Sequence, residues 1–176
     1  MVDTEEDVNF RHIVQSQYLA ALEMLKRVIE SCPDALWDDP SYRNRFWHMA
    51  YHALFYTHLY VQPGERDFVP WAKHRPNLNF MGPLPWPPHD VPDPGEPYSQ
   101  EELLAYLDHC RDQVRQQTAA LDLERSDSGF GWIPLSKLEL QFYTIRHLQQ
   151  HTGELCERLY VAAGKEVDWV GARPDG

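Results

Sequence analysis

The sequence predicts an all-α fold: a four-helix bundle with a long proline-rich crossover loop between its second and third helices. Three observations lead to this prediction. Four stretches have apolar residues at helical spacing, no stretch alternates as a strand does, and ten of the fourteen prolines fall within residues 62–98. The length suits one core of ordinary size, so residues 1–176 are expected to form a single domain.

The first two helices are expected over about residues 7–31 and 41–61. In the first, apolar residues recur at intervals of three and four until Pro33 ends the pattern. The second follows Pro40 and is apolar on nearly all sides, which is typical of a buried helix.

The last two helices are each expected to begin with a capping box, in which a serine and a glutamate three residues later satisfy free backbone donors. The pairs are Ser99 with Glu102 and Ser136 with Glu139. Apolar residues at helical spacing follow both pairs, and Gly164 is expected to cap the end of the last helix.

Residues 62–98 cannot form a helix, because proline interrupts the backbone ladder at short intervals. A connection of this length is unusual inside a compact domain. It carries four large rings that a disordered linker does not need: Phe68, Trp71, Phe80 and Trp86. We expect an ordered loop that packs over the helices and covers a site.

Composition excludes several classes of protein. The formal net charge is −11 and basic runs are absent, so neither nucleic acid nor an anionic membrane surface is an expected partner. No apolar stretch approaches the roughly 20 residues of a membrane span. The acidic start lacks the apolar run of a signal peptide, which favours a cytoplasmic protein. The three cysteines lie far apart and are expected to be free thiols.

The candidate functional residues are histidines. His147 and His151 stand four apart in YTIRHLQQHTGEL, and this spacing places both on one face of a helix. That face also carries the apolar residues, so both imidazoles are expected to point inward. Two buried imidazoles need polar partners, and a divalent metal ion satisfies both. Simple packing of two histidines at the edge of the core is the alternative.

The helix over 41–61 shows the same spacing, with His48 and His52 four apart. His58 lies about 120° from His52 around the helix, so it is not expected to join them. A catalytic zinc-like site has about three protein ligands, whereas all four histidines together would make a closed, structural site. HExxH, Glu-x-x-His, GxSxG, P-loop and GxGxxG motifs are absent.

These features resemble the DinB-like (YfiT-like) metalloenzyme family. The resemblance rests on the H-x-x-x-H-x-G-x-L pattern of His147, His151, Gly153 and Leu155, and more loosely on WHMAYHALFYTHLY. It implies a four-helix bundle, often a homodimer, that holds a divalent metal ion by one histidine of the second helix and two of the fourth. His52 is favoured over His48 for the first of these. Metal identity stays open among Zn, Ni and Fe.

The resemblance also implies a function, since characterised relatives include thiol-dependent transferases and an isomerase. We expect a metal-dependent S-transferase or hydrolase that acts on a low-molecular-weight thiol or another small molecule. A metal lowers the pKa of a bound water or thiol enough to make a nucleophile near neutral pH. Candidate pocket walls, with ordinary core packing as the alternative, are Trp47, Tyr51, Phe55, Trp71, Trp86 and Tyr143. Arg146 and Glu154 flank the motif and are expected on a solvated helix face, with contacts that orient the ligands as the alternative. A non-catalytic metal-binding helical dimer is the alternative function, and a helical dimer without metal is a third.

Overall fold

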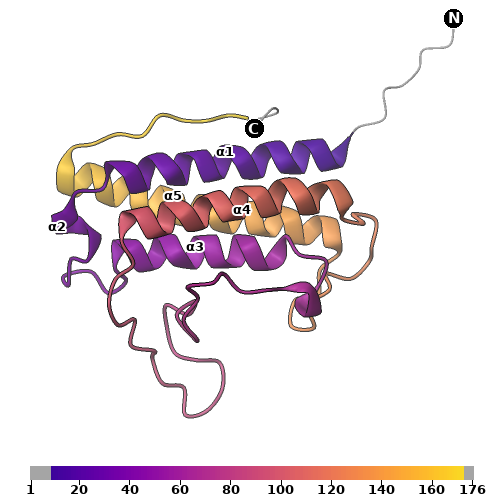
Figure 1. Ribbon diagram of the computed structural model, residues 1–176, viewed down its shortest axis with the longest axis horizontal. Helices are drawn as coiled ribbons and strands as arrows, with labels where there is room; N and C mark the ends of the chain where they lie inside the picture. Colours follow the sequence, from indigo (N-terminus) through magenta and orange to yellow (C-terminus); the bar gives the residue numbers. More distant parts are fainter. Residues whose placement is uncertain (1–8, 173–176) are drawn as a thin grey trace, which may run out of the picture.

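The computed structural model describes residues 9–172, and within them the chain is all-helical (Figure 1). No β-strand occurs in this range, which confirms the predicted all-α class. The elements, in order, are α1 (Phe10–Ser31), α2 (Asp34–Trp37), α3 (Phe46–Tyr60), a 3-10 turn (Glu65–Asp67), α4 (Gln100–Ala120) and α5 (Lys137–Ala163).

The four long helices lie side by side (Figure 1). α1 and α3 each pack against both α4 and α5, so α1 lies diagonally across from α3. α3 and α5 run in opposite directions, which brings the end of α3 close to the start of α5 (Figure 1). A side chain in the middle of α3 can therefore meet side chains in the middle of α5.

Most helix ends agree with the sequence, but the short α2 was not predicted. Residues 7 and 8, at the expected start of the first helix, lie outside the described residues. Ser99 and Glu102 form the full capping box, Ser136 accepts from the backbone N–H of Glu139, and Gly164 takes the left-handed conformation at the end of α5. The helix predicted over 41–61 instead begins at Phe46. The Asp39 carboxylate accepts from the Ser41 N–H and holds the chain in a turn before α3.

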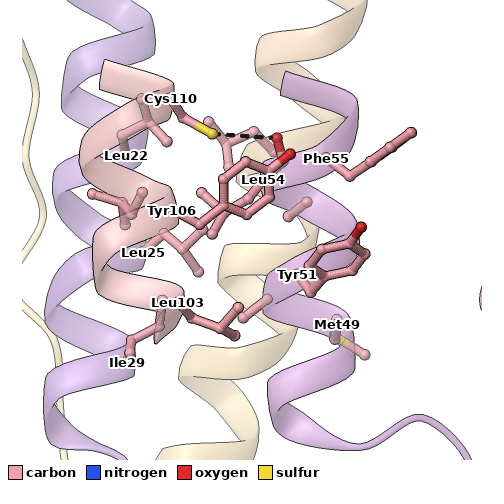
Figure 2. Close-up of a cluster of buried hydrophobic side chains, with 14 of the residues drawn as sticks. Leu22, Leu25, Ile29, Met49, Tyr51, Leu54, Phe55, Leu103, Tyr106 and Cys110 are labelled. Carbon is pink, nitrogen blue, oxygen red and sulfur yellow. Dashed lines mark hydrogen bonds between the residues drawn. The ribbon is translucent and has the colours of Figure 1, made fainter. Parts of the chain in front are cut away.

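The apolar core lies between all four long helices, with Leu140, Leu148, Leu155 and Leu159 as the contribution of α5. Figure 2 shows the part of it between α1, α3 and α4. One face of α3 contributes Tyr51, Leu54 and Phe55, and the Cys110 thiol of α4 donates to the Leu54 carbonyl. Burial of a large apolar side chain contributes roughly 1.5–3 kcal/mol, so this face of α3 is strongly fixed. The next positions around the helix, including His52, are thereby directed away from this cluster and toward α5.

Rings of the 62–98 segment pack on the helices. The Trp71 ring stacks on Tyr106 of α4, with centroids 4.5 Å apart and planes 12° apart. The Arg75 guanidinium lies over the Tyr98 ring and donates to the carbonyls of Pro94 and Glu96. Much of this segment therefore has a defined position against the helices, although its one regular element is the 3-10 turn at Glu65–Asp67.

A buried lysine joins the end of α3 to the start of α5. Lys137, the first residue of α5, is 1% exposed. Its ammonium donates to the carbonyls of Gln62, Pro63 and Ser128, at 2.6, 3.1 and 2.8 Å. Burial lowers the pKa of Lys137 to about 8, so the ammonium stays charged at neutral pH. These bonds fix the start of α5 against the end of α3.

Two further expectations concern the chain as a whole. The three cysteines are free thiols, as predicted, with Cys32 and Cys110 buried. Within residues 9–172, no helix combines the length and the apolarity that a membrane span requires.

Candidate metal centre

Three of the four candidate histidines meet between α3 and α5. The Nε2 atom of His147 lies 3.0 Å from Nε2 of His52 and 3.1 Å from Nε2 of His151. One nitrogen from each ring can be chosen so that all three lie within 4.8 Å of one another. Within residues 9–172, this is the one group of three or more metal-binding side chains that converges in this way.

A backbone carbonyl orients His52. Its Nδ1 atom lies 2.6 Å from the carbonyl oxygen of Asn79, in the segment that follows α3. A carbonyl oxygen can only accept, so Nδ1 carries the proton and the lone pair of the neutral ring lies on Nε2. That lone pair faces His147 of α5.

A carboxylate orients His151 in the same manner. Its Nδ1 atom donates to Oε2 of Glu154 at 2.8 Å, and Gln150 donates to the other oxygen of that carboxylate at 3.2 Å. The lone pair of neutral His151 therefore also lies on Nε2. Glu154 is exposed, as expected of a solvated helix face, and it also contacts a candidate ligand, because the i,i+3 spacing puts it one turn beyond His151.

The converging nitrogens fit a cation. Two of the three Nε2 atoms carry lone pairs, and His147 can offer at most one proton between them. At least one of these lone pairs therefore lacks a hydrogen-bond donor among the three rings. A divalent metal ion would instead accept a lone pair from the Nε2 atom of each ring. Two imidazole nitrogens on one tetrahedral zinc-like ion are about 3.4 Å apart, close to the separations found here.

The surroundings also favour the neutral form of His52 and His147, which metal binding requires. Burial, followed by the neighbouring imidazoles, lowers the pKa of His52 to about 3. Burial and then His151 lower the pKa of His147 to about 4. A proton therefore competes weakly for these nitrogens at neutral pH.

The structure does not bring His48 to this group. The His48 side chain is buried one turn before His52, and its Nε2 donates to the carbonyl of Leu78 at 2.7 Å. Three histidines, rather than four, thus converge, and the choice between His48 and His52 that the spacing left open falls to His52 as the member of the group.

His58 lies apart from the group, as its position around the helix predicts. It is 2% exposed and pairs with His109 of α4 through Nε2 atoms 3.3 Å apart. The Tyr106 hydroxyl lies 3.3 Å from its Nδ1. If this hydroxyl donates to Nδ1, His58 carries its proton on Nε2 and donates to His109, so this pair is satisfied without an ion.

Acid is expected to destabilise the protein through His58. Burial, followed by His109, lowers the pKa of His58 to about 3, below the 6.5 of an unfolded histidine. Between these values the unfolded chain binds more protons, so the free energy of unfolding falls as the pH drops below 6.5, by at most about 1.4 kcal/mol per unit for this group. Urea unfolding in chelator should show a loss from pH 7 to pH 5 about 2 kcal/mol larger for the native chain than for His58→Phe. Equal losses in the two proteins would refute this role, and His12→Gln, at an exposed position, should behave as the native chain does.

An open cavity adjoins His147. It has a volume of about 420 Å³ and is lined by Tyr143, Arg146, His147, Gln149 and Gln150 of α5. Arg146 is exposed, and no ion-pair partner lies within 4 Å of it among the described residues. The cavity therefore combines a free positive charge with hydroxyl and amide groups, at the edge of the histidine group.

Of the rings proposed as pocket walls, Tyr143 alone lines this cavity. Trp47 and Tyr51 are fully buried in the core, and Phe55 is 7% exposed. The Trp71 ring stacks on Tyr106 of α4, and the Trp86 ring packs against Phe80 of its own segment. A ring that sequence reasoning missed is Tyr56, whose edge approaches His147 with centroids 5.5 Å apart. Tyr56 follows His52 by one helical turn, and this spacing could have predicted that its ring lies beside the histidine group.

Comparison with known proteins gives one match. The model of one protein family, described as the DinB superfamily, matches residues 9–155, which include all three converging histidines. No curated protein and no solved structure is similar enough to the chain to give a match.

Proposed function

The chain belongs to the DinB superfamily, and from this membership and the histidine geometry we propose that it binds one divalent metal ion through His52, His147 and His151. The observation that carries the proposal is the convergence of three imidazole Nε2 atoms on one point, where the rings have too few protons to hydrogen-bond one another fully. We propose Zn, Ni or Fe as the ion, because imidazole suits all three. We also propose that the chain forms one DinB/YfiT-like four-helix bundle, with residues 62–98 as its crossover.

We further propose that the protein is a metal-dependent enzyme, of the thiol S-transferase or hydrolase type. A divalent ion in this place supplies Lewis-acid chemistry, since it lowers the pKa of a water or thiol bound to it. Three protein ligands are typical of catalytic sites, and structural sites are usually closed by four. The donation from His48 to the Leu78 carbonyl supports the three-ligand reading over the non-catalytic one.

The residues around the ligands have separate tasks in this proposal. The Asn79 carbonyl and the Glu154 carboxylate hold the protons of His52 and His151 on Nδ1, and so direct both Nε2 atoms at the ion. The rings of Tyr56 and Tyr143 shield His147 from water on two sides. Arg146 binds an anionic group of the substrate in the adjoining cavity.

The test is an activity screen of metal-loaded protein against the same protein after chelation. A low-molecular-weight thiol and a chromogenic aryl halide serve as substrates, with hydrolysis of activated esters and amides as a second arm. Transfer or hydrolysis that disappears with chelator and returns with metal is the expected result. A metal-loaded protein without turnover in either arm would favour the non-catalytic alternative. The homodimer and the cytoplasmic location stay predictions.

Arg146→Ala is expected to discriminate between substrates by charge. Loss of a charge-assisted hydrogen bond of about 1.5–3 kcal/mol raises KM for glutathione, a carboxylate-bearing thiol, by roughly 10–100-fold. KM for 2-mercaptoethanol, which is neutral, should change little, and metal content should not change. Steady-state kinetics on both thiols measure this, with Arg43→Ala, also at an exposed position, as the control. An equal effect of Arg146→Ala on the two thiols would contradict anion binding by Arg146.

A further inference from the structure

Three side chains of α3, each one turn apart, contact the same two residues of the segment after α3. The His48 Nε2 atom lies 2.7 Å from the Leu78 carbonyl, and the His52 Nδ1 atom lies 2.6 Å from the Asn79 carbonyl. The Tyr56 hydroxyl accepts from the side-chain amide of Asn79 at 3.2 Å. The segment thus runs along one face of α3 at the level of the histidine group.

The two carbonyls have adjacent places in the backbone. Leu78 and Asn79 are consecutive, and their two carbonyls are bound by histidines four residues apart. Asn77, just before them, has a φ of 65°, a left-handed conformation that asparagine tolerates and that turns the chain toward α3. Both Leu78 and Asn79 are buried, so water does not replace a lost donor easily at either carbonyl.

We propose that His48 is a positioning residue for the metal centre: it holds the Leu78 carbonyl and thereby sets the Asn79 carbonyl against His52. The inference rests on the proposed function, since it concerns how strongly the three-histidine group holds an ion. It assigns different tasks to two histidines with the same helical spacing. His52 binds the ion, and His48 fixes the loop that orients His52.

The physical reason lies in the proton of His52. Its ring presents a lone pair to the ion from Nε2 while Nδ1 donates, and the Asn79 carbonyl is the acceptor of that donation. Without His48, the Leu78 carbonyl loses its donor, and the segment is free to move away from α3. His52 then loses the acceptor that fixes its tautomer and its rotamer. Loss of such an outer partner typically weakens metal binding by 10–100-fold.

A matched pair of variants separates positioning from ligation. In His48→Gln, the side-chain amide nitrogen takes the place of Nε2 and still donates to the Leu78 carbonyl. In His48→Leu, a side chain of similar size fills the buried space and cannot donate. Zn²⁺ affinity is measured for the native chain and both variants by competition with a chromogenic chelator, and the visible spectrum of the Co²⁺-loaded proteins reports the ligand set.

The expected result is a native-like affinity, within threefold, for His48→Gln and a 10–100-fold loss for His48→Leu. The Co²⁺ spectrum of His48→Gln should match that of the native chain. A native affinity in His48→Leu would overturn the proposal. Equal losses in both variants, with a changed Co²⁺ spectrum in His48→Gln, would also overturn it, because His48 would then be a ligand.

A measurement on the metal-free native chain separates failure of this inference from failure of the proposed function. ¹⁵N shifts of the imidazoles should place the His48 proton on Nε2 and the His52 proton on Nδ1. A proton on Nδ1 of His48 would refute the inference even if the protein binds zinc tightly. This measurement does not depend on whether any variant folds. Absence of Zn²⁺ binding by the native chain, with both protons as expected, would instead refute the metal centre while the loop contact stands.

Discussion

Replacing His147 and His151 together with alanine is expected to abolish the stabilisation of this protein by divalent metal ions. The two imidazoles supply two of the three converging nitrogens, and the remaining His52 cannot hold an ion alone. For the native chain, Zn²⁺ at about 100 times its Kd should add about 2.7 kcal/mol to the free energy of unfolding, which raises Tm by about 5–10 °C. The double variant should show no rise.

The measurement is a thermal unfolding series in chelator and at increasing Zn²⁺, for both proteins. His12→Ala is the control, because it removes an exposed histidine of α1 that lies outside the group. It should respond to zinc as the native chain does. A double variant that zinc still stabilises by the native amount would place the metal somewhere else on the protein.

The second large effect is expected from Lys137→Met, which should lower the free energy of unfolding by about 2–6 kcal/mol, the cost of leaving two buried carbonyls without a donor. Methionine keeps the length of the side chain but donates to none of the three carbonyls that Lys137 now satisfies. Of these, the Pro63 carbonyl keeps a donor in Arg125, and the other two lose theirs. A buried carbonyl without a donor costs about 1–3 kcal/mol. The lost bonds also join the start of α5 to the end of α3, so the metal affinity of the variant should fall with its stability.

Urea unfolding at pH 7 measures the change. Lys26→Met is the matched control: Lys26 lies on the surface of α1 and pairs with Glu30, a contact worth at most about 1 kcal/mol. The account of Lys137 fails if both variants unfold at the same urea concentration. A loss of unfolding free energy in Lys137→Met alone would support the role of Lys137.

The sequence predicted the long helices and two of the three converging histidines from local patterns, and it left the third open between His52 and His48. Helix periodicity and capping are local properties, so Ser99, Ser136 and Gly164 could be assigned from their neighbours alone. The spacing of His147 and His151 within one helix is local as well, and the inward face followed from the leucines around them. These predictions need no knowledge of which other helix packs against the predicted one.

The rest depends on contacts between distant parts of the chain. The difference between His48 and His52 is set by the carbonyls of Leu78 and Asn79, about thirty residues away in a segment with no periodicity. Lys137 resembles an ordinary surface residue in the first turn of a helix, and its burial follows from the turn at Gln62 and Pro63 that lies over it. No local pattern encodes either contact.

Glu154 shows the limit of a local pattern most plainly. Its spacing from His151 allows a contact, but the same spacing is common on solvated helix faces. Half of the Glu154 environment is indeed open, since its side chain is 44% exposed. The hydrogen bond to Nδ1 of His151 makes sense once His52 and His147 are known to meet the other nitrogens.

The three histidines on α3 and α5 are proposed to hold one divalent metal ion, and elemental analysis is the first test of this proposal. The native protein, purified without chelator, is analysed beside the His147→Ala/His151→Ala variant. We expect about one equivalent of Zn, Ni or Fe per native chain and almost none in the variant. A native protein that carries no metal and takes up none from added zinc, nickel or iron would contradict it, and the three imidazoles would then be histidines that pack together without an ion.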